Sequence, residues 1–250
     1  MEVAVSKILR TAAHVHSEWS DDAAWSLDAI ARSFRRRRYN AVLMCEHSRG
    51  WTARRYGDYV EACAAASRDG LLLVPGIEYE EEDNVVHVAV WGHLPFFGPT
   101  PDIGELLGKV AAADGISVLA HPWRREAWRR FEHSWAQHLT AIEIWNRKYD
   151  GWAPNRFAVE MVRRERLGEF VSLDFHTRRQ FFPLAMALRV ERDAKLDRDA
   201  VYSALRAGAF ECRAFRRSAL DLTQGVRLGG LEMCERLRRP AARQLRRITG

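Results

Sequence analysis

The chain has 250 residues, of which 47% are hydrophobic, and this length suits one domain with a sizeable buried core. No apolar run is long enough to cross a bilayer and no leader pattern opens the chain, so a cytoplasmic protein with no membrane span is expected. The net charge of +6 is unevenly distributed, because residues 213–250 hold ten arginines against three acids. A nearly neutral body is therefore followed by a basic tail.

Short apolar runs alternate with helical stretches along the chain. The expected strands are 7–13, 41–45, 71–74, 85–91, 116–120, 141–145 and 170–173. The expected helices are 26–38, 56–69, 103–113, 124–139, 155–166 and 197–207. Ser26 is a good N-cap for the first helix, and Gly70 follows the second. Strands alternating with helices predict a parallel sheet with crossover helices, and six or seven such units favour a barrel.

The histidines lie where these strands end. Seven of the nine are at the end of an expected strand: His14, His16, His47, His87, His93, His121 and His176. Strand ends converge on one face of an α/β barrel, where sites are built. On a strand, the i, i+2 spacing of His14 and His16 projects both rings from one side, and Asp174 and His176 repeat it. A lone pair at this spacing is a weak signal, but five such elements in order predict a metal site.

Two further carboxylates complete the candidate ligands. Asp21 is on the loop after the first strand, and Glu78 follows Pro75-Gly76, where we expect the chain to turn and present the carboxylate. Nitrogen and carboxylate ligands together suit zinc, manganese or iron. One carboxylate can bridge two ions, and closely spaced ions can hold a phosphoryl group and generate hydroxide near neutral pH.

These motifs resemble a known family, the polymerase and histidinol phosphatase (PHP) phosphoesterases. The matching segments are His14-Val-His-Ser-Glu-Trp-Ser-Asp21, Glu46-His47, Pro75-Gly-Ile-Glu78, His87-Val-Ala-Val-Trp-Gly92, Ala120-His121-Pro122, Ile142-Glu-Ile-Trp-Asn146 and Ser172-Leu-Asp174-Phe-His176. The resemblance runs from about residue 8 to about residue 212 and does not cover the tail. The chain departs from the family pattern at Ala12, at Cys45-Glu46 and at Asp22, where the family usually has glycine.

The resemblance implies an α/β fold with a distorted seven-stranded (β/α)7 TIM-like barrel over residues 1–212 and a basic helical extension over 213–250. It also implies two to three divalent ions, with a hydroxide between two of them attacking phosphorus. The implied ligand sets are His14, His16, Glu78 and Asp174; Glu78, His87 and His121; and Asp21, His47 and His176. Among these ligands, Glu78, His121 and Asp174 would also act in catalysis.

The substrate is less closely defined. Arg124 and Arg178 follow ligand positions and are candidates to hold phosphate oxygens, although most arginines of this chain are expected to face solvent. The first hypothesis is a phosphomonoesterase for a small phosphorylated metabolite or nucleotide. The alternative is a phosphodiesterase or nuclease that holds nucleic acid through the basic tail and the run Arg35–Arg38. A third hypothesis, a non-catalytic metal-binding module, would fit a chain that lacks some of these ligands.

Overall fold

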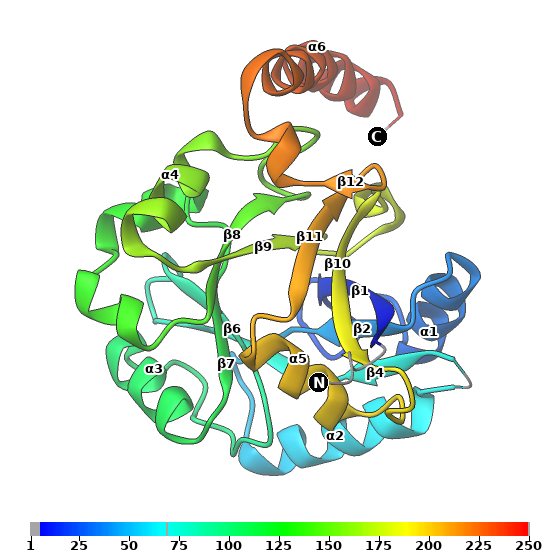
Figure 1. Cartoon of the computed structure of the whole chain (residues 1–250), viewed down its shortest axis with the longest axis vertical. Coiled ribbons are helices and arrows are strands. Elements are labelled where there is room, and N and C mark those ends of the chain that lie inside the picture. Colours follow the sequence, from blue (N-terminus) through cyan, green and yellow to red (C-terminus); the bar gives the residue numbers. More distant parts are fainter. Residues whose placement is uncertain (1–5, 69, 250) are drawn as a thin grey trace, which may run out of the picture.

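Two mixed sheets form the centre of the computed structural model, which describes residues 6–68 and 70–249 (Figure 1). The strands are β1 (Ser6–Val15), β2 (Ala41–Met44), β3 (Glu46–His47), β4 (Leu72–Val74), β5 (Gly76–Glu80), β6 (His87–Trp91), β7 (Ile116–Leu119), β8 (Ala141–Asn146), β9 (Gly168–Ser172), β10 (Leu184–Glu191), β11 (Phe210–Ala214) and β12 (Arg217–Ser218). One six-stranded sheet has the order β12-β11-β10-β1-β2-β4, and the other has the order β3-β5-β6-β7-β8-β9.

Helices surround these strands, and α6 lies at one end of the molecule beside β12 (Figure 1). The α-helices are α1 (Leu27–Arg36), α2 (Ala53–Ala66), α3 (Ile103–Ala112), α4 (Arg156–Glu165), α5 (Arg198–Arg206) and α6 (Gly225–Thr249). The 3-10 segments are η1 (Arg124–Arg130), η2 (His133–Gln137), η3 (Arg178–Gln180) and η4 (Leu220–Leu222). Ser26 caps α1 as expected, because its side chain accepts a hydrogen bond from the Ala29 N–H. None of the described helices is both long and apolar enough to cross a membrane.

The two sheets are joined at both edges. Only Cys45 separates β2 from β3, and only Pro75 separates β4 from β5, so each pair is one chain path that passes from the first sheet to the second. At the other edge, the segment after β9 hydrogen-bonds to β1: Leu173 N–H donates to Ala13 O, and Phe175 N–H donates to His14 O, both at 3.0 Å. The ends of β1, β3, β5 and β9 therefore meet on one side of the molecule.

The mixed α/β class is confirmed, but several expected details are wrong. The strands are not all parallel, since β6 is antiparallel to both β5 and β7, and β10 is antiparallel to both β1 and β11. A buried apolar run has the same pattern in either direction, so strand direction could not be predicted from these runs. The expected helix over 124–139 is two 3-10 segments, because Arg125 and Glu126 have left-handed backbones. The described strands form two sheets rather than one closed ladder.

The basic tail does not begin as a separate element. Residues 213–218 continue the first sheet as the end of β11 and as β12, and the helix starts only at Gly225. Helix α6 packs on the body through Glu235, which is 5% exposed and accepts the Trp152 N–H at 3.0 Å. Arg238 and Arg239 also bond to the Glu235 carboxylate. Arg243, Arg246 and Arg247 have side chains outside the described part.

Candidate metal centre

Side chains from six places in the chain converge where the strands end. The contributing residues are His14 and His16 at the end of β1, His47 in β3, Glu78 in β5, His87 at the start of β6, His121 after β7, and Asp174 and His176 after β9. All are buried. Because β6 runs antiparallel to its neighbours, its first residue lies beside the last residues of the parallel strands. This explains how a histidine at the start of a strand joins the others.

Glu78 lies at the centre of one group. Its Oε1 is 2.8 Å from His87 Nδ1 and 2.9 Å from His121 Nε2. Its Oε2 is 3.2 Å from His47 Nδ1 and 3.4 Å from His14 Nε2. Burial disfavours the charge of this carboxyl, but the surrounding imidazoles, His14 first, hold its pKa well below the usual range. His16 Nε2 also lies 3.6 Å from Oε2, so one ionised carboxylate faces five rings.

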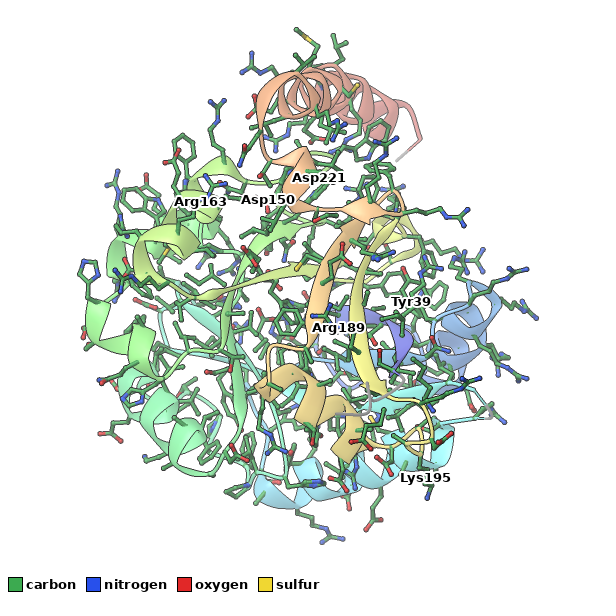
Figure 2. The ribbon with its side chains drawn as sticks, in the orientation of Figure 1. Tyr39, Asp150, Arg163, Arg189, Lys195 and Asp221 are labelled. Carbon is green, nitrogen blue, oxygen red and sulfur yellow. The ribbon has the colours of Figure 1, made fainter. Side chains whose placement is uncertain are left out.

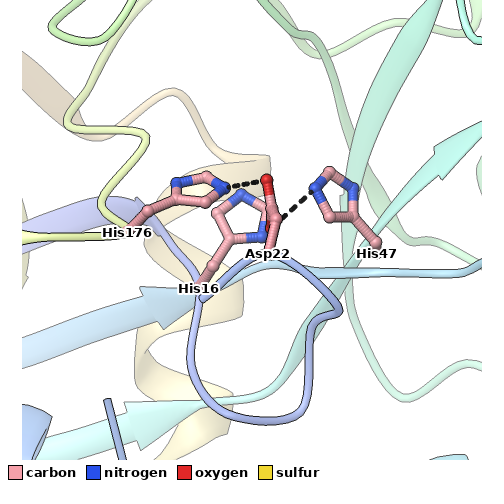
Figure 3. A group of neighbouring side chains, drawn as sticks. All are labelled: His16, Asp22, His47 and His176. Atoms are coloured by element: carbon pink, nitrogen blue, oxygen red, sulfur yellow. Dashed lines mark ion pairs between the residues drawn. The ribbon is translucent and has the colours of Figure 1, made fainter. Parts of the chain in front are cut away.

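A second group is formed by His16, Asp22, His47 and His176 (Figure 3). Asp22 Oδ2 is 2.9 Å from His176 Nε2, and Asp22 Oδ1 is 3.4 Å from His47 Nε2. Burial opposes ionisation of Asp22, yet hydrogen bonds from both rings lower its pKa far below the usual value. Burial lowers the pKa of His47, but its hydrogen bond to Asp22 and the negative charge of Glu78 outweigh this effect and raise that pKa to about 9.

The aspartate of this group is not the one expected from the sequence. Both aspartates are exposed. Asp21 takes no part in the described clusters of possible ligands, whereas Asp22, with a side chain 46% exposed, takes part in one. Both residues lie in the turn between β1 and α1, where adjacent side chains point in different directions. The position where the family pattern usually has glycine thus supplies the carboxylate.

Two buried carboxylates, which were not expected as site residues, position the rings of His14 and His16 through their Nδ1 atoms. His14 Nδ1 is 2.8 Å from Glu143 Oε1, and Glu143 Oε2 accepts the His121 N–H at 2.8 Å. Glu46 accepts the hydroxyl protons of Ser17 and Ser20. Since Ser20 Oγ donates to Glu46, it accepts from His16 Nδ1, 3.1 Å away. Carboxylates of this kind fix the tautomer and orientation of ligand histidines.

The opposite ring nitrogens point inward, toward Glu78 Oε2, but make no hydrogen bond. His14 Nε2, His16 Nε2 and His47 Nδ1 are buried without a hydrogen bond to any described residue. Buried polar atoms are rarely left in this state, so these nitrogens indicate a missing ligand. The possible ligands form four groups, and within each group the ligand atoms lie within 4.8 Å of one another. The groups are His16, Asp22, His47 and His176; His14, Glu78 and His121; His14, His16 and Asp174; and His47, Glu78 and His87. The residues fit divalent ions in number, type and orientation.

Three of these residues have unusual backbones. His14, His121 and Asp174 have φ angles of 59°, 27° and 46°, in the left-handed region that side chains other than glycine avoid. Each follows a run of extended residues, and at His14 the pairing of β1 with β2 shifts register. A bulge at His14, and not the straight strand that we expected, therefore brings the rings of His14 and His16 to the same site. Strain of this kind costs about 1–3 kcal/mol per residue and concentrates at functional sites.

Two cationic side chains, Lys148 and Arg124, lie at the cluster, and only Arg124 was expected from the sequence. Lys148 was not expected, yet its Nζ is 3.0 Å from His176 Nε2 and 3.4 Å from Asp174 Oδ1. Its only signal is its place just after the Ile142–Asn146 motif. The expected Arg124 reaches the site, since its Nη1 is 3.0 Å from His87 Nε2. Its guanidinium also donates to Asn84.

Two expected residues lie away from the cluster. The Arg178 guanidinium is 5.4 Å from the ring centre of Trp25, in a hollow beside α1. His93 pairs with Asp199 at the surface. The two residues differ from the ligand histidines in burial, because the side chain of His93 is 58% exposed and Arg178 is also exposed.

We expected Pro75-Gly76 to turn the chain before Glu78. Gly76 is instead the first residue of β5, the strand that carries Glu78. The Trp91 indole donates to Met44 O at 2.7 Å directly beside it, and a Cβ on Gly76 would be only 2.6 Å from that oxygen. We expect Gly76→Ala to lower the free energy of unfolding by about 1–3 kcal/mol through overpacking.

Urea unfolding followed by circular dichroism measures this effect. The control is Gly108→Ala on α3, where a Cβ meets nothing within 4 Å and helix propensity predicts a gain of about 0.5–1 kcal/mol. Equal effects of the two substitutions would contradict the close packing at Gly76.

Comparison with known proteins defines the fold. No family model matches the sequence, and no curated protein matches it either. PsfC from Pseudomonas syringae is 14% identical with a TM-score of 0.54, over 95% of this chain and 99% of that one. An amidohydrolase from Chromobacterium violaceum, solved with bound sulfate and no metal, is 15% identical with a TM-score of 0.50, over 67% and 88%. A candidate metal-dependent phosphoesterase from Bifidobacterium adolescentis is 15% identical with a TM-score of 0.49, over 78% and 95%. Identities this low describe the fold, which is consistent with the PHP type expected from the motifs.

Proposed function

We propose that this chain is a metal-dependent phosphoesterase that hydrolyses a phosphomonoester of a small metabolite or nucleotide. The observation that carries the proposal is the set of buried imidazole nitrogens without partners, which face the carboxylates of Glu78 and Asp174. The full set of ligands argues against the non-catalytic hypothesis.

Two or three ions of zinc, manganese or iron are proposed for these ligand groups. Asp22 replaces Asp21 in the proposed set, together with His47 and His176. Such ions, when bound, lower the pKa of water and stabilise negative charge on phosphoryl oxygens. Glu143 holds the His14 ring in place through Nδ1, so that Nε2 faces the ion.

The chain itself offers two cations for the substrate. Arg124 and Lys148 lie at the edge of the cluster, beside His87 and His176 respectively. Their proposed role is to bind phosphoryl oxygens through charge-assisted hydrogen bonds. Arg178 is farther out and is proposed for a more distant part of the substrate.

We also propose that the strands close into an irregular seven-stranded barrel. Taking β2 with β3 and β4 with β5 as bent strands, the pairings run from β1 through β9, and the bonds from residues 173–175 return to β1. The interruptions at Cys45 and Pro75 divide this ring into two ladders. This closure would bring every proposed ligand to one mouth.

The first test measures metal content by elemental analysis on gently purified protein and on a His14→Ala variant. Turnover of p-nitrophenyl phosphate and bis-p-nitrophenyl phosphate is measured on the same samples. We expect two to three equivalents of metal and preferential hydrolysis of the monoester, with both lost in the variant. Preference for the diester would favour the phosphodiesterase alternative, and no metal with no turnover after adding manganese or zinc would refute the proposal.

A further inference from the structure

Exposed arginines gather along the last turns of α1. Arg32, Arg35 and Arg36 are exposed, and among the described residues none of the three has a carboxylate within ion-pair distance. Two adjoining hollows of about 480 and 360 Å³ share Arg32 and Arg36 in their walls. Unpaired like charges repel one another, so such a cluster creates a strongly positive surface.

The larger of these hollows is lined by residues that are close in sequence to proposed metal ligands. Its wall includes Trp25 and Glu18 from the turn before α1, and Asp22 of the second ligand group lies in that same turn. Arg178, two residues after His176, forms another part of the wall. Glu18 is the one acid in this wall, so the hollow stays positive.

A second basic groove lies on the outer face of the first sheet. Its floor is formed by Ala185 and Ala187 of β10, which carry only a methyl group. In the sheet register Ala187 faces Arg10 on β1, and Ala185 faces Arg213 on β11, so arginines flank the alanines on both sides. The groove measures about 590 Å³.

This sheet face is open. Figure 1 shows β10 and β11 crossing the front of the molecule with no helix over their upper halves. Figure 2 places Arg189 on the same face, and its side chain is exposed. Arg38 and Arg216 complete the walls of the groove. Arg213 is paired with Glu211, whereas Arg38 and Arg216 form no ion pair within the described chain.

The two regions are continuous. Arg10 from the groove donates through Nη1 to Arg37 O at the end of α1, at 2.7 Å, and its guanidinium is 4.1 Å from the ring centre of Tyr39. Figure 2 shows Tyr39 between α1 and the sheet. We name the resulting surface the arginine belt and define it by Arg10, Arg32, Arg36, Arg38, Arg178 and Arg216.

We propose that the arginine belt binds the sugar–phosphate backbone of a nucleic-acid strand. Guanidinium groups match phosphate oxygens in geometry, and a row of them suits a chain of regularly spaced phosphates. The alanine floor lets that chain approach the sheet closely. A membrane surface fits less well, because basic membrane-binding segments pair their charges with several inserted apolar side chains. The lining of this groove holds one large exposed apolar side chain, Ile8, beside the alanines.

The arginine belt lies off helix α6, and Arg216 is the belt residue that belongs to residues 213–250. On α6, Arg238 and Arg239 are already engaged by Glu235, and Glu232 of the same helix pairs with Arg156 of α4. The belt goes beyond the proposed hydrolysis and does not depend on it, because binding to it needs no metal.

The test uses the full chain in EDTA, with fluorescence anisotropy of a labelled 20-nucleotide single strand and the matching duplex at several salt concentrations. The belt variant is Arg32→Gln/Arg36→Gln/Arg38→Gln. The control Arg163→Gln/Arg227→Gln/Arg236→Gln removes the same charge from exposed positions on α4 and α6. We expect the belt variant to bind at least about tenfold more weakly, with a slope of log K against log salt about 2–3 shallower.

Equal weakening in both variants would overturn the proposal, because net charge alone would explain it. Failure of the unaltered chain to bind either nucleic acid would do the same, including the case in which it binds phosphatidylserine vesicles instead. Thermal unfolding checks that both variants are folded. Turnover of p-nitrophenyl phosphate with metal restored reports separately on the proposed hydrolysis, which can fail while the belt still binds.

Discussion

Replacing Glu78 by glutamine is expected to reduce phosphoester turnover by at least about 10³-fold, the largest single effect in this chain. Its carboxylate lies within 3.6 Å of five imidazoles and is the only carboxylate common to two of the described ligand clusters. Glutamine keeps the shape but has no charge to bridge two ions, and metal-assisted charge stabilisation is worth several kcal/mol. Elemental analysis should show the loss of at least about one equivalent of metal.

The matched control for this substitution is Glu82→Gln. Glu82 belongs to the same acidic stretch after Pro75 but is exposed, and it joins no described ligand cluster. It should keep both metal and turnover. A Glu78→Gln protein that retained full metal content and activity would show that this carboxylate is structural.

The second large effect distinguishes two neighbouring aspartates. Asp22→Asn should lower the affinity for one ion by at least about tenfold and lower turnover with it, because Asp22 contacts His47 and His176. Asp21→Asn makes the same chemical change one residue away, at an exposed position outside the clusters, and should have little effect. Metal titration of both proteins measures the difference. A larger loss in Asp21→Asn would restore the assignment made from the family pattern.

Much of the candidate site could be predicted from the sequence because its ligands are tied to strand ends. His47, His121 and His176 each follow or end a short apolar run, so their convergence needed only the alternation of strands and helices. The pair Asp21 and Asp22 could not be resolved in this way. Their side chains are identical, and which one faces the histidines depends on the backbone of a turn.

Strand direction was the main feature of the fold that could not be predicted from the sequence. The apolar run of β6 is buried along its whole length, and such a run reads the same in both directions. Lys148 was missed for a related reason, because a single lysine after a strand is typical of a solvated loop. Only the fold places its ammonium group beside Asp174 and His176.

The left-handed backbones of His14, His121 and Asp174 have a consequence for how this site is expected to evolve. At such positions glycine is more stable than histidine or aspartate, so a use for the side chain favours the present residues there. A descendant that no longer needed the ions would be expected to drift to glycine at all three places and to gain stability. In related chains, the residues at these three positions therefore serve as a marker of whether the chemistry has been kept.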